Sequence, residues 1–545
     1  MVTARADLLI VDARPWSDGA PLPDADAVAV GAGRVLAVGR AAELAPLAGP
    51  ATRRLDARGA TVTPALADAH IHLVAWARSR AELALFDCAS RAQALARVAA
   101  HLAAHPGTEP VVGRGWDGNL WSEPPGRAAL DAVTGTRPVL LHSRDFHTLW
   151  VNSAALARAG ISRATPDPEG GRLERDAANE PTGLIREHAV RRFASLAAAP
   201  APEVDRALLR DAIAALHAQG ITAVHDFEGV EEHRLLRAMT LGEGAGLRVL
   251  MHVPHAALDH ALGVGLASGT GDDRFRVGAL KLFADGTLGS QTAAMLEPYE
   301  GSRERGMELI APAELARLVA RAVAGGLAVA IHAIGDRAVR SALDAIAAAP
   351  ALGTLALPQR IEHVQLLDPA DRPRFAALGV VASMQPSHAT SDMDIAARHW
   401  GARAERSYPW RSLLAAHARL VFGSDAPVEP PESATGLCSA VTRQRADGTP
   451  AQGFAPAERI DLDQALTAYT ESAARVSGCW PRLGRIAPGA VADLAVWDTD
   501  LHRLAPLALT TARVAATVME GAVVFERGAA LGEAAGLAAA HGGGR

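Results

Sequence analysis

The sequence predicts an α/β protein built on a TIM-like (β/α)8 barrel. Apolar strand-like runs alternate with helical stretches through the middle of the chain, a pattern that is typical of a parallel sheet or barrel. Eight of these runs end in polar residues, and eight repeats of a strand and a helix are the number that closes a barrel. Both ends of the chain consist instead of short β-rich runs separated by Gly, Pro and Asp, so we expect a separate β-domain there.

The composition excludes several classes of protein. The 545 residues carry a net charge of −6, with 49% apolar and 21% charged residues, which is ordinary for a soluble globular protein and argues against a nucleic-acid partner. The three cysteines, Cys88, Cys438 and Cys479, lie too far apart for a thiolate zinc site and fit a reducing cytosol. The N-terminal residues lack the apolar run of a signal peptide, and no apolar run is long enough to span a membrane. We expect a cytoplasmic protein that acts on a small molecule.

The β-domain is expected to come from both chain ends. Isolated hairpins are only marginally stable, so we expect the two ends to pair into one small β-sandwich that comprises residues 1–63 and 482–545. Residues 528–545 are rich in Ala and Gly and are expected to form a frayed tail. The strand-like runs of the two ends are 7–12, 27–31, 34–38, 493–497, 514–519 and 522–525.

The barrel is expected to comprise residues 64–108 and 203–481. The stretch 109–202 is far too long for a loop between a strand and a helix, and it has strand-like and helical segments of its own. We therefore expect it to be an inserted subdomain, after the first strand, that lies over the barrel mouth. The eight candidate strands end near His72, Asp226, His252, Lys281, His332, His363, Met384 and Ser424.

His70 and His72 form the first candidate metal site. On an extended strand, residues two apart point to the same side, so both imidazoles can bind one ion. Two histidines with this spacing are weak evidence alone, because strand histidines are often simply packed or exposed at the surface.

Three further residues at strand ends strengthen the metal hypothesis. His332 and His363 each follow an apolar run, at the ends of consecutive strands. A single histidine there is more often structural, but two in one barrel face the same mouth, and neutral imidazole is a common zinc ligand. Asp425 directly follows another strand, where a buried carboxylate is costly unless it is paired or bound. In isolation Asp425 is better explained as a turn or helix-cap residue, whereas beside four histidines it is a candidate ligand and proton carrier.

Lys281 lies in the middle of an apolar strand, where a charged amine is costly. It either forms an ion pair, with Asp285 or Glu187 as candidate partners, or it is carbamylated by CO₂ and becomes a carboxylate that bridges two metal ions. The spacing alone does not distinguish these alternatives.

A second group of polar and aromatic residues falls near the expected mouth. Some lie in the insertion, where they either line a pocket or hold the subdomain together. Others follow the fourth and seventh strands, where they either bind substrate or orient a metal ligand. The candidates for substrate binding are Trp116, His147, Trp150, Asp285, Gln385 and His388.

The order of the metal-site residues (HxH, a strand lysine, His, His, Asp) resembles the amidohydrolase superfamily. One branch is especially similar, the amidohydrolase family 3 proteins, which include N-substituted formamide deformylase and the YtcJ-like proteins. One departure is Ala65, where the family usually has a glycine, in a turn before the ligands. The similar stretches extend over nearly the whole chain: residues 281–299, 332–339, 360–365, 383–388, 421–428 and 484–497.

The resemblance implies a TIM-like barrel with a flanking β-sandwich, and it implies a role for each residue of the site. The first histidine pair would bind the more buried metal ion. A carbamylated Lys281 would bridge to a second ion that His332 and His363 hold. Asp425 would contact the buried ion and carry protons.

The resemblance also implies a reaction. We expect a metal-dependent hydrolase with one or two divalent ions, zinc being the expected metal. It would cleave a carbon–nitrogen bond other than a peptide bond, in an amide, a formamide or a cyclic imide, by attack of a metal-bound hydroxide. Two alternatives stay open: a non-catalytic binder, and a deaminase of the same superfamily that acts on an aminated heterocycle. Such deaminases usually use one metal and no bridging lysine, so Lys281 counts against the second. A homo-oligomer also stays open.

Overall fold

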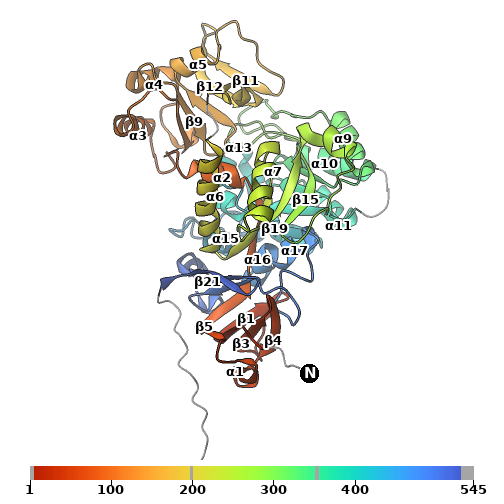
Figure 1. Cartoon of the computed structure of the whole chain (residues 1–545). Helices are drawn as coiled ribbons and strands as arrows, with labels where there is room; N and C mark the ends of the chain where they lie inside the picture. The colour runs from red at the N-terminus through yellow and green to blue at the C-terminus, as the bar shows by residue number, and fades with distance from the viewer. Residues whose placement is uncertain (1–4, 197–199, 350–354, 529–545) are drawn as a thin grey trace, which may run out of the picture.

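The structure is a computed structural model, and it describes residues 5–196, 200–349 and 355–528. Figure 1 shows three parts: a barrel in the centre, an inserted domain at one end, and a β-domain built from both ends of the chain at the other. The barrel carries all six residues of the predicted metal site, and the other two parts are attached to its two ends.

The barrel is a sheet of eight parallel strands in the order β19-β18-β17-β16-β15-β14-β13-β6. All eight predicted strands are present, and the nearly closed sheet confirms the predicted TIM-like α/β fold. Two backbone contacts join its first and last strands: the Asp425 N–H donates to the His70 carbonyl at 2.7 Å, and the His72 N–H donates to the Ala426 carbonyl at 2.8 Å. The strands are β6 (Leu66–Ile71), β13 (Ile221–Asp226), β14 (Arg248–Pro254), β15 (Phe275–Phe283), β16 (Val329–Ala333), β17 (Arg360–His363), β18 (Val381–Met384) and β19 (Arg419–Phe422).

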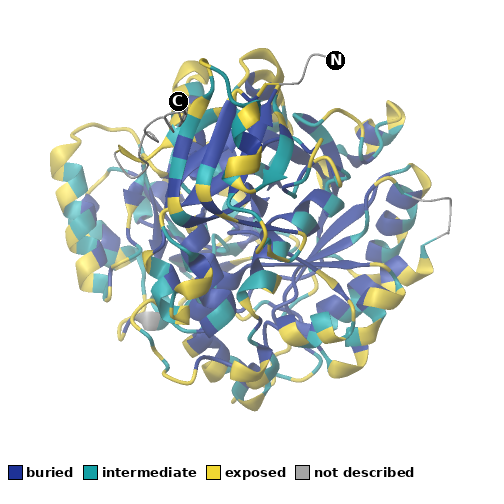
Figure 2. Ribbon diagram, turned by 90° about the horizontal axis from the view of Figure 1, so that it is seen from below, coloured by how far each residue is buried: buried dark blue, intermediate teal, exposed yellow. Residues whose placement is uncertain are grey.

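Helices cover the outside of the barrel, and Figure 2 shows their buried faces turned towards the strands and their exposed faces turned outwards. In α9 (Pro312–Ala324), Leu315, Leu318 and Ala322 are buried at helical spacing, so one face of the helix packs on the barrel. Pro312 stands in the first turn, where its missing N–H is not needed. The other helices of this part are α2 (Leu73–Ser79), α6 (Pro202–His217), α7 (Val230–Arg237), α8 (Leu258–Gly263), α10 (Asp336–Ala348), α11 (Arg372–Ala377), α12 (Pro386–Ser391), α13 (Met393–Trp400), α14 (Trp410–Ala415), α15 (Ser433–Thr442), α16 (Leu462–Tyr469) and α17 (Glu471–Val476).

Both chain ends contribute to one sheet, in the order β22-β21-β20-β5-β1-β3-β4 with β2 added to β1. β20 pairs antiparallel with β5, with Leu494 opposite Pro64, and this pairing joins the two ends. The hydrogen-bonded sheet is continuous, so the sandwich form that we expected is not confirmed. Residues 529–545 of the predicted tail lie outside the described residues. The elements are β1 (Leu8–Ser17), β2 (Ala20–Pro21), β3 (Ala27–Gly31), β4 (Arg34–Gly39), α1 (Ala41–Leu44), β5 (Arg53–Pro64), β20 (Leu494–Trp497), β21 (Val514–Met519) and β22 (Ala522–Glu526).

The inserted domain is built on a six-stranded sheet in the order β11-β12-β10-β9-β8-β7. We expected the insertion to begin at residue 109, but its sheet already includes β7 (Leu83–Ala84), which pairs with β8. α3 (Arg91–Ala104) belongs to it as well, because Ala94 and Val98 pack into the same apolar core as Leu141. The other elements are β8 (Val111–Trp116), α4 (Arg127–Thr134), β9 (Val139–Ser143), β10 (Thr148–Val151), α5 (Ser153–Arg158), β11 (Gly171–Arg175) and β12 (Pro181–Glu187).

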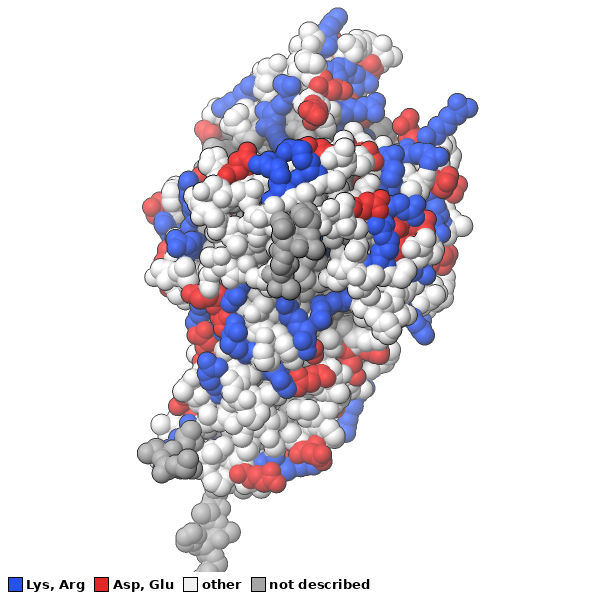
Figure 3. Space-filling model, turned by 90° about the vertical axis from the view of Figure 1, so that its right-hand side faces the viewer, with Lys and Arg blue, Asp and Glu red and all other residues white. Residues whose placement is uncertain are grey.

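Basic and acidic residues are interspersed on the face that Figure 3 shows. Opposite charges are therefore close neighbours on this face, and it has no broad area of one sign. Among the residues that the structure describes, no helix combines the length and the apolar character that crossing a bilayer requires.

A buried ion pair links the barrel to the β-domain. Arg248, the first residue of β14, donates to the two carboxylate oxygens of Asp493 at 2.7 and 3.2 Å and to Glu520 at 3.0 Å. The side chains of Arg248 and Asp493 are 5% and 6% exposed. Removing Asp493 would leave the buried Arg248 with only the more exposed Glu520 as a partner, and removing Arg248 would leave Asp493 as an unpaired buried charge, so this contact contributes to the attachment of the two parts.

We expect Asp493→Ala to lower the free energy of unfolding by about 1–3 kcal/mol, because the buried Arg248 would lose the partner that accepts two of its hydrogen bonds and keep only the more exposed Glu520. The measurement is the thermal midpoint by calorimetry. The control is Glu314→Ala, which removes the exposed partner of Arg317 and should leave the midpoint unchanged. Equal midpoints for the two variants would contradict the role of the buried pair.

Candidate functional site

The carboxyl ends of the barrel strands open into a cavity of about 580 Å³. Residues of the barrel and of the inserted domain both line it, with Arg144 and His147 among those from the inserted domain. Strand ends of one barrel meet at one rim, so residues far apart in the sequence come together there. All six residues of the predicted metal site line the cavity: His70, His72, Lys281, His332, His363 and Asp425.

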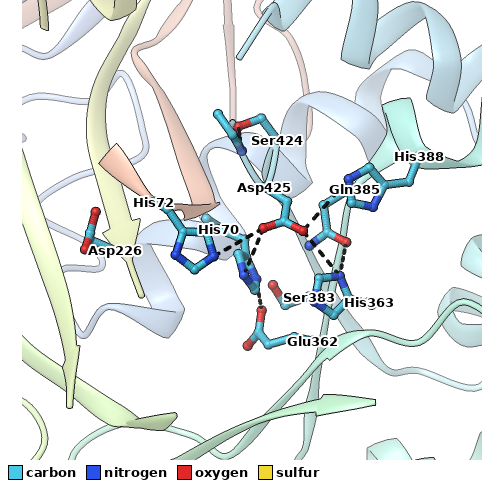
Figure 4. Close-up of polar contacts among 12 residues, drawn as sticks. His70, His72, Asp226, Glu362, His363, Ser383, Gln385, His388, Ser424 and Asp425 are labelled. Atoms are coloured by element: carbon cyan, nitrogen blue, oxygen red, sulfur yellow. Dashed lines mark hydrogen bonds and ion pairs between the residues drawn. The ribbon is translucent and has the colours of Figure 1, made fainter. Parts of the chain in front are cut away.

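A buried network of charges holds His70 in place (Figure 4). Its Nδ1 donates to Glu362 Oε2 at 2.7 Å. Arg360 donates to the two oxygens of Glu362 at 2.5 and 3.0 Å, and also to the Ala69 carbonyl and the Ser383 hydroxyl. Since the proton of His70 is on Nδ1, its Nε2 is free to bind a metal ion.

Asp425 lies among four imidazoles (Figure 4). Its Oδ1 is 3.5 Å from Nε2 of both His70 and His72, and its Oδ2 is 3.9 Å from Nδ1 of His363 and 4.0 Å from Nε2 of His388. Burial raises the pKa of Asp425, but the nearby imidazoles, first His70 and then His72, lower it well below its ordinary value. Asp425 is therefore ionised at neutral pH and can bind a cation or accept a proton.

The backbone is strained at two of these positions. The φ angle is +74° at His363 and +59° at Asp425, a region that residues other than glycine rarely adopt. Such strain persists only where the surroundings hold the residue, and it gathers at functional sites. Gly423 is part of those surroundings, because a Cβ added there would lie 2.3 Å from the His70 amide nitrogen. The close approach of the first and last strands therefore requires a glycine at this position.

Three residues of the predicted site have the geometry of a metal-binding cluster. His70, His363 and Asp425 each offer one ligand atom, and these atoms lie within 4.8 Å of one another. Burial, followed by the charge of Lys281, lowers the pKa of His70 to about 4, and burial lowers the pKa of His363 well below its ordinary value. Both imidazoles are neutral at neutral pH, which is the form that binds metal. Two imidazoles and a carboxylate fit a divalent ion.

His332 and His363 are neighbours at the rim, and one hydrogen bond fixes each ring. His332 Nε2 donates to the Gly286 carbonyl at 3.0 Å, and His363 Nδ1 donates to Gln385 Oε1 at 2.9 Å. The two ring centroids are 4.5 Å apart, and the other nitrogen of each ring is free. Gln385, which we expected to bind substrate, is fully buried and orients His363.

Lys281 is 3% exposed, and its Nζ lies 4.4 and 4.8 Å from the ring centroids of Phe227 and Phe283. In the described part of the chain it has no ion pair. Its two candidate partners, Asp285 and Glu187, bind other groups. Burial lowers the pKa of this amine to about 8, although nearby carboxylates oppose the shift. Of the 54 lysine and arginine residues in the chain, Lys281 is the only lysine.

The structure separates the other candidates for substrate binding. Trp116, His147 and His388 line the cavity. Trp150 is buried in the core of the inserted domain, where its ring meets that of Trp116 edge to face at 5.9 Å. Asp285 is also fully buried, because its carboxylate accepts three backbone N–H groups from the adjoining loops. The structure thus gives Trp150 a packing role and Asp285 a role in holding loops.

Several side-chain contacts tie the inserted domain to the barrel mouth, among them those of Glu187 and Asp145. His147 Nδ1 donates to Glu187 Oε2 at 2.6 Å, and the other oxygen of Glu187 accepts the Thr292 hydroxyl of the barrel at 2.5 Å. Burial lowers the pKa of His147, but the charge and the hydrogen bond of Glu187 outweigh this effect and raise it to about 9. Asp145 accepts the Thr287 hydroxyl of the barrel at 2.9 Å.

Sequence reasoning missed Arg360, Glu362 and Asp68. Asp68 accepts the Ser424 hydroxyl at 2.5 Å and the His70 N–H at 3.2 Å, so it ties the first strand to the residues after the last. A signal for the other two was present: they stand two apart in a short strand that was predicted to belong to the barrel, and so share one face. Two opposite charges that are buried on the same face are expected to form an ion pair, because either one alone would be strongly destabilising.

Comparison with known proteins finds relatives over nearly the whole chain. Residues 53–525 match a model described as the amidohydrolase family. The putative amidohydrolase YtcJ of Bacillus subtilis (strain 168) is 31% identical over 88% of this chain and 91% of that protein. N-substituted formamide deformylase of Arthrobacter pascens is 30% identical over 96% of this chain and 99% of that protein. A solved structure, an uncharacterised metal-dependent hydrolase from Pyrococcus horikoshii, has a TM-score of 0.72 and 26% identity, and the match covers 95% of this chain and 99% of that one.

We expect Glu362→Gln to weaken zinc binding about 10- to 100-fold, because the amide no longer fixes the proton on Nδ1 of His70. The measurement is competition with a chromophoric chelator, on metal-depleted full-length protein. Glu304→Gln, at an exposed position, is the control and should bind zinc as the wild type does. Wild-type affinity in a folded Glu362→Gln protein would refute this orienting role.

Proposed function

The chain belongs to the amidohydrolase family and is a metal-dependent hydrolase; from that premise we propose that it cleaves a carbon–nitrogen bond other than a peptide bond, in an amide, a formamide or a cyclic imide. The observation that carries the proposal is the cluster of His70, His363 and Asp425 at the base of a cavity wide enough for a small molecule. A relative named for the deformylation of N-substituted formamides supports the choice of bond.

The residues at the rim fit a divalent ion, for which zinc is our proposal. His70, His72 and Asp425 would hold one ion, and His332 and His363 would hold a second beside it. A bound ion supplies Lewis-acid polarisation of the substrate carbonyl and activation of water at neutral pH.

Asp425 is the proposed proton carrier. The attacking water forms a bond to the carbonyl carbon and gives a proton to the Asp425 carboxylate. When the carbon–nitrogen bond breaks, Asp425 returns that proton to the leaving nitrogen, so the amine departs neutral and the carboxylate is regenerated. The inserted domain covers part of the cavity and limits the entry of bulk water.

We propose that Lys281 carries a carbamate. Its neutral amine nitrogen forms a bond to the carbon of CO₂ and loses a proton, and the product is a carboxylate-like group that can link two ions. Two observations support this: the amine is buried without a carboxylate partner in the described residues, and it is the only lysine of the chain. All the other basic residues of this kind in the chain are arginines. Arginine stays protonated in proteins and cannot undergo this reaction.

We expect metal-loaded protein in ¹³C-bicarbonate to give one carbamate carbon resonance that Lys281→Met lacks. The α-amine of the chain is unchanged in the variant and serves as the internal control. Because the chain has a single lysine and the variant keeps the α-amine, a resonance that is present in the wild type and absent from Lys281→Met belongs to Lys281. An unmodified Lys281 amine in protein that holds its metal would refute the proposed carbamate.

We expect the wild type to hydrolyse members of a screen of formamides, N-acyl amines and cyclic imides, and Asp425→Asn to fold normally but to lose about 10²- to 10⁴-fold in kcat. The measurement is amine release by metal-loaded protein, with the metal content of each sample determined. Asp447→Asn, in an exposed loop, is the control for a carboxylate lost elsewhere.

Full activity of Asp425→Asn would remove its assigned role. Ammonia release from aminated heterocycles, without turnover of any amide or imide, would replace the proposal with a deaminase. Metal far below stoichiometric after supplementation would favour a non-catalytic binder.

A further inference from the structure

One carboxylate on the cavity wall, Asp392, has no ion pair among the described residues. Asp392 directly follows α12 and lines the cavity. Its Oδ2 accepts the Tyr408 hydroxyl at 2.6 Å and the Gln365 amide at 3.4 Å. Within the described residues, Oδ1 has no hydrogen-bond partner, and neither oxygen has a basic side chain within ion-pair distance. The fully buried ring of Tyr408 thus holds one oxygen in place and leaves the other open.

Two basic groups act on Asp392 from beyond ion-pair distance, His388 and Arg144. His388 also faces Asp425, at 4.0 Å, and Arg144 is already paired, because its guanidinium donates twice to Glu429 Oε1, at 3.1 and 2.7 Å. The same guanidinium also acts on Asp117, so three carboxylates share it. Burial raises the pKa of Asp392 to about 6, and the group is still ionised at neutral pH. A cation bound here would offset the cost of placing that charge in a partly enclosed cavity.

Two buried polar side chains beside Asp392 give an independent indication of a ligand. Gln365 is 3% and His388 is 5% exposed, and both line the cavity. As far as the chain is described, Oε1 of Gln365 and Nε2 of His388 have no hydrogen-bond partner. An acceptor oxygen beside a carboxylate that has no ion pair matches a ligand that carries several N–H donors.

We propose that Asp392, Gln365 and His388 form a subsite for a positively charged, N–H-bearing group of the substrate, such as a primary ammonium. This rests on the proposed function, because it specifies which amides the enzyme would hydrolyse: those that carry a short aminoalkyl group.

The subsite lies close to the reacting centre. His388 and Asp392 stand four residues apart at one end of α12 and share a face, separated by about one helical turn, roughly 5.4 Å. His388 Nε2 is itself 4.0 Å from Asp425 Oδ2 (Figure 4). A substrate whose carbonyl lies at Asp425 would place its ammonium only a few bonds away. Phe146 and Ile395, which also line the cavity, suit the apolar carbons between them.

The test compares N-formyl diamines of graded chain length with N-formyl alkylamines in which a methyl group replaces the ammonium. Binding is measured by calorimetry on metal-depleted full-length protein, so turnover plays no part in this readout. We expect the wild type to bind the best-fitting charged compound about 10- to 100-fold more tightly than its uncharged counterpart. We expect Asp392→Asn to abolish that preference.

Asp394→Asn is the matched control, because that carboxylate lies two residues further on and pairs with Arg445 at the surface; the preference should be unchanged. Tyr408→Phe removes the hydroxyl that holds Oδ2 and should reduce the preference, which keeps the subsite testable if Asp392→Asn does not fold. No preference in the wild type, or the same preference in Asp392→Asn, would overturn the subsite.

The same compounds separate this inference from the proposed function. Tight binding of the charged compounds, with no hydrolysis by zinc-loaded protein of either series or of any amide or imide in the screen, would leave the subsite standing and refute the proposed cleavage of a carbon–nitrogen bond. Hydrolysis of both series at equal kcat/KM, with equal binding, would support the proposed function and refute the subsite.

Discussion

The candidate site depends on the buried ion pair between Arg360 and Glu362. Neither charge could stay in the barrel interior alone, because an unpaired buried ion is strongly destabilising. Together they fix the proton of His70 through Glu362 and connect β17 to its surroundings through the contacts of Arg360 with Ala69 and Ser383. One interaction therefore sets the orientation of a candidate ligand and holds together three strands, β6, β17 and β18. The metal site and the barrel interior are parts of a single network.

The seam of the barrel lies at the same place. β6 and β19 meet through Asp68, Gly423 and the backbone contacts around Asp425, without the regular ladder that joins the other strands. Because the seam residues adjoin the candidate ligands, the closure of the sheet also sets the distance between His70 and Asp425. The left-handed backbone of Asp425 persists because both strand ends hold it. This coupling explains why a strained residue is compatible with a stable fold.

The sequence allowed the strands and the candidate site to be predicted where the apolar pattern of a segment and the position of its polar residues pointed to the same structure. Apolar runs predicted the eight barrel strands, and the short β-rich runs at both chain ends predicted that the ends pair. The spacing of His70 and His72, a lysine inside a strand and polar residues at strand ends gave the six residues that the structure brings to one cavity. The start of the insertion could not be found in this way, because the apolar face of α3 does not reveal which sheet it packs on. Trp150 and Asp285 stand near pocket residues in the sequence, yet an aromatic core holds one and backbone N–H groups hold the other. Those partners come from other segments, which a local pattern does not specify.

Lys281 also gives the molecule a distinctive chemical property. It is the only lysine in the chain, and it is 3% exposed at the wall of the cavity, so a reagent reaches its ε-amine only through the barrel mouth. Amine-directed cross-linkers and enzymes too large for that mouth would leave this side chain unmodified. The rate at which a small amine-directed dye reacts with it would therefore report how freely the mouth admits a small molecule and how much of the amine is unmodified, without an introduced probe.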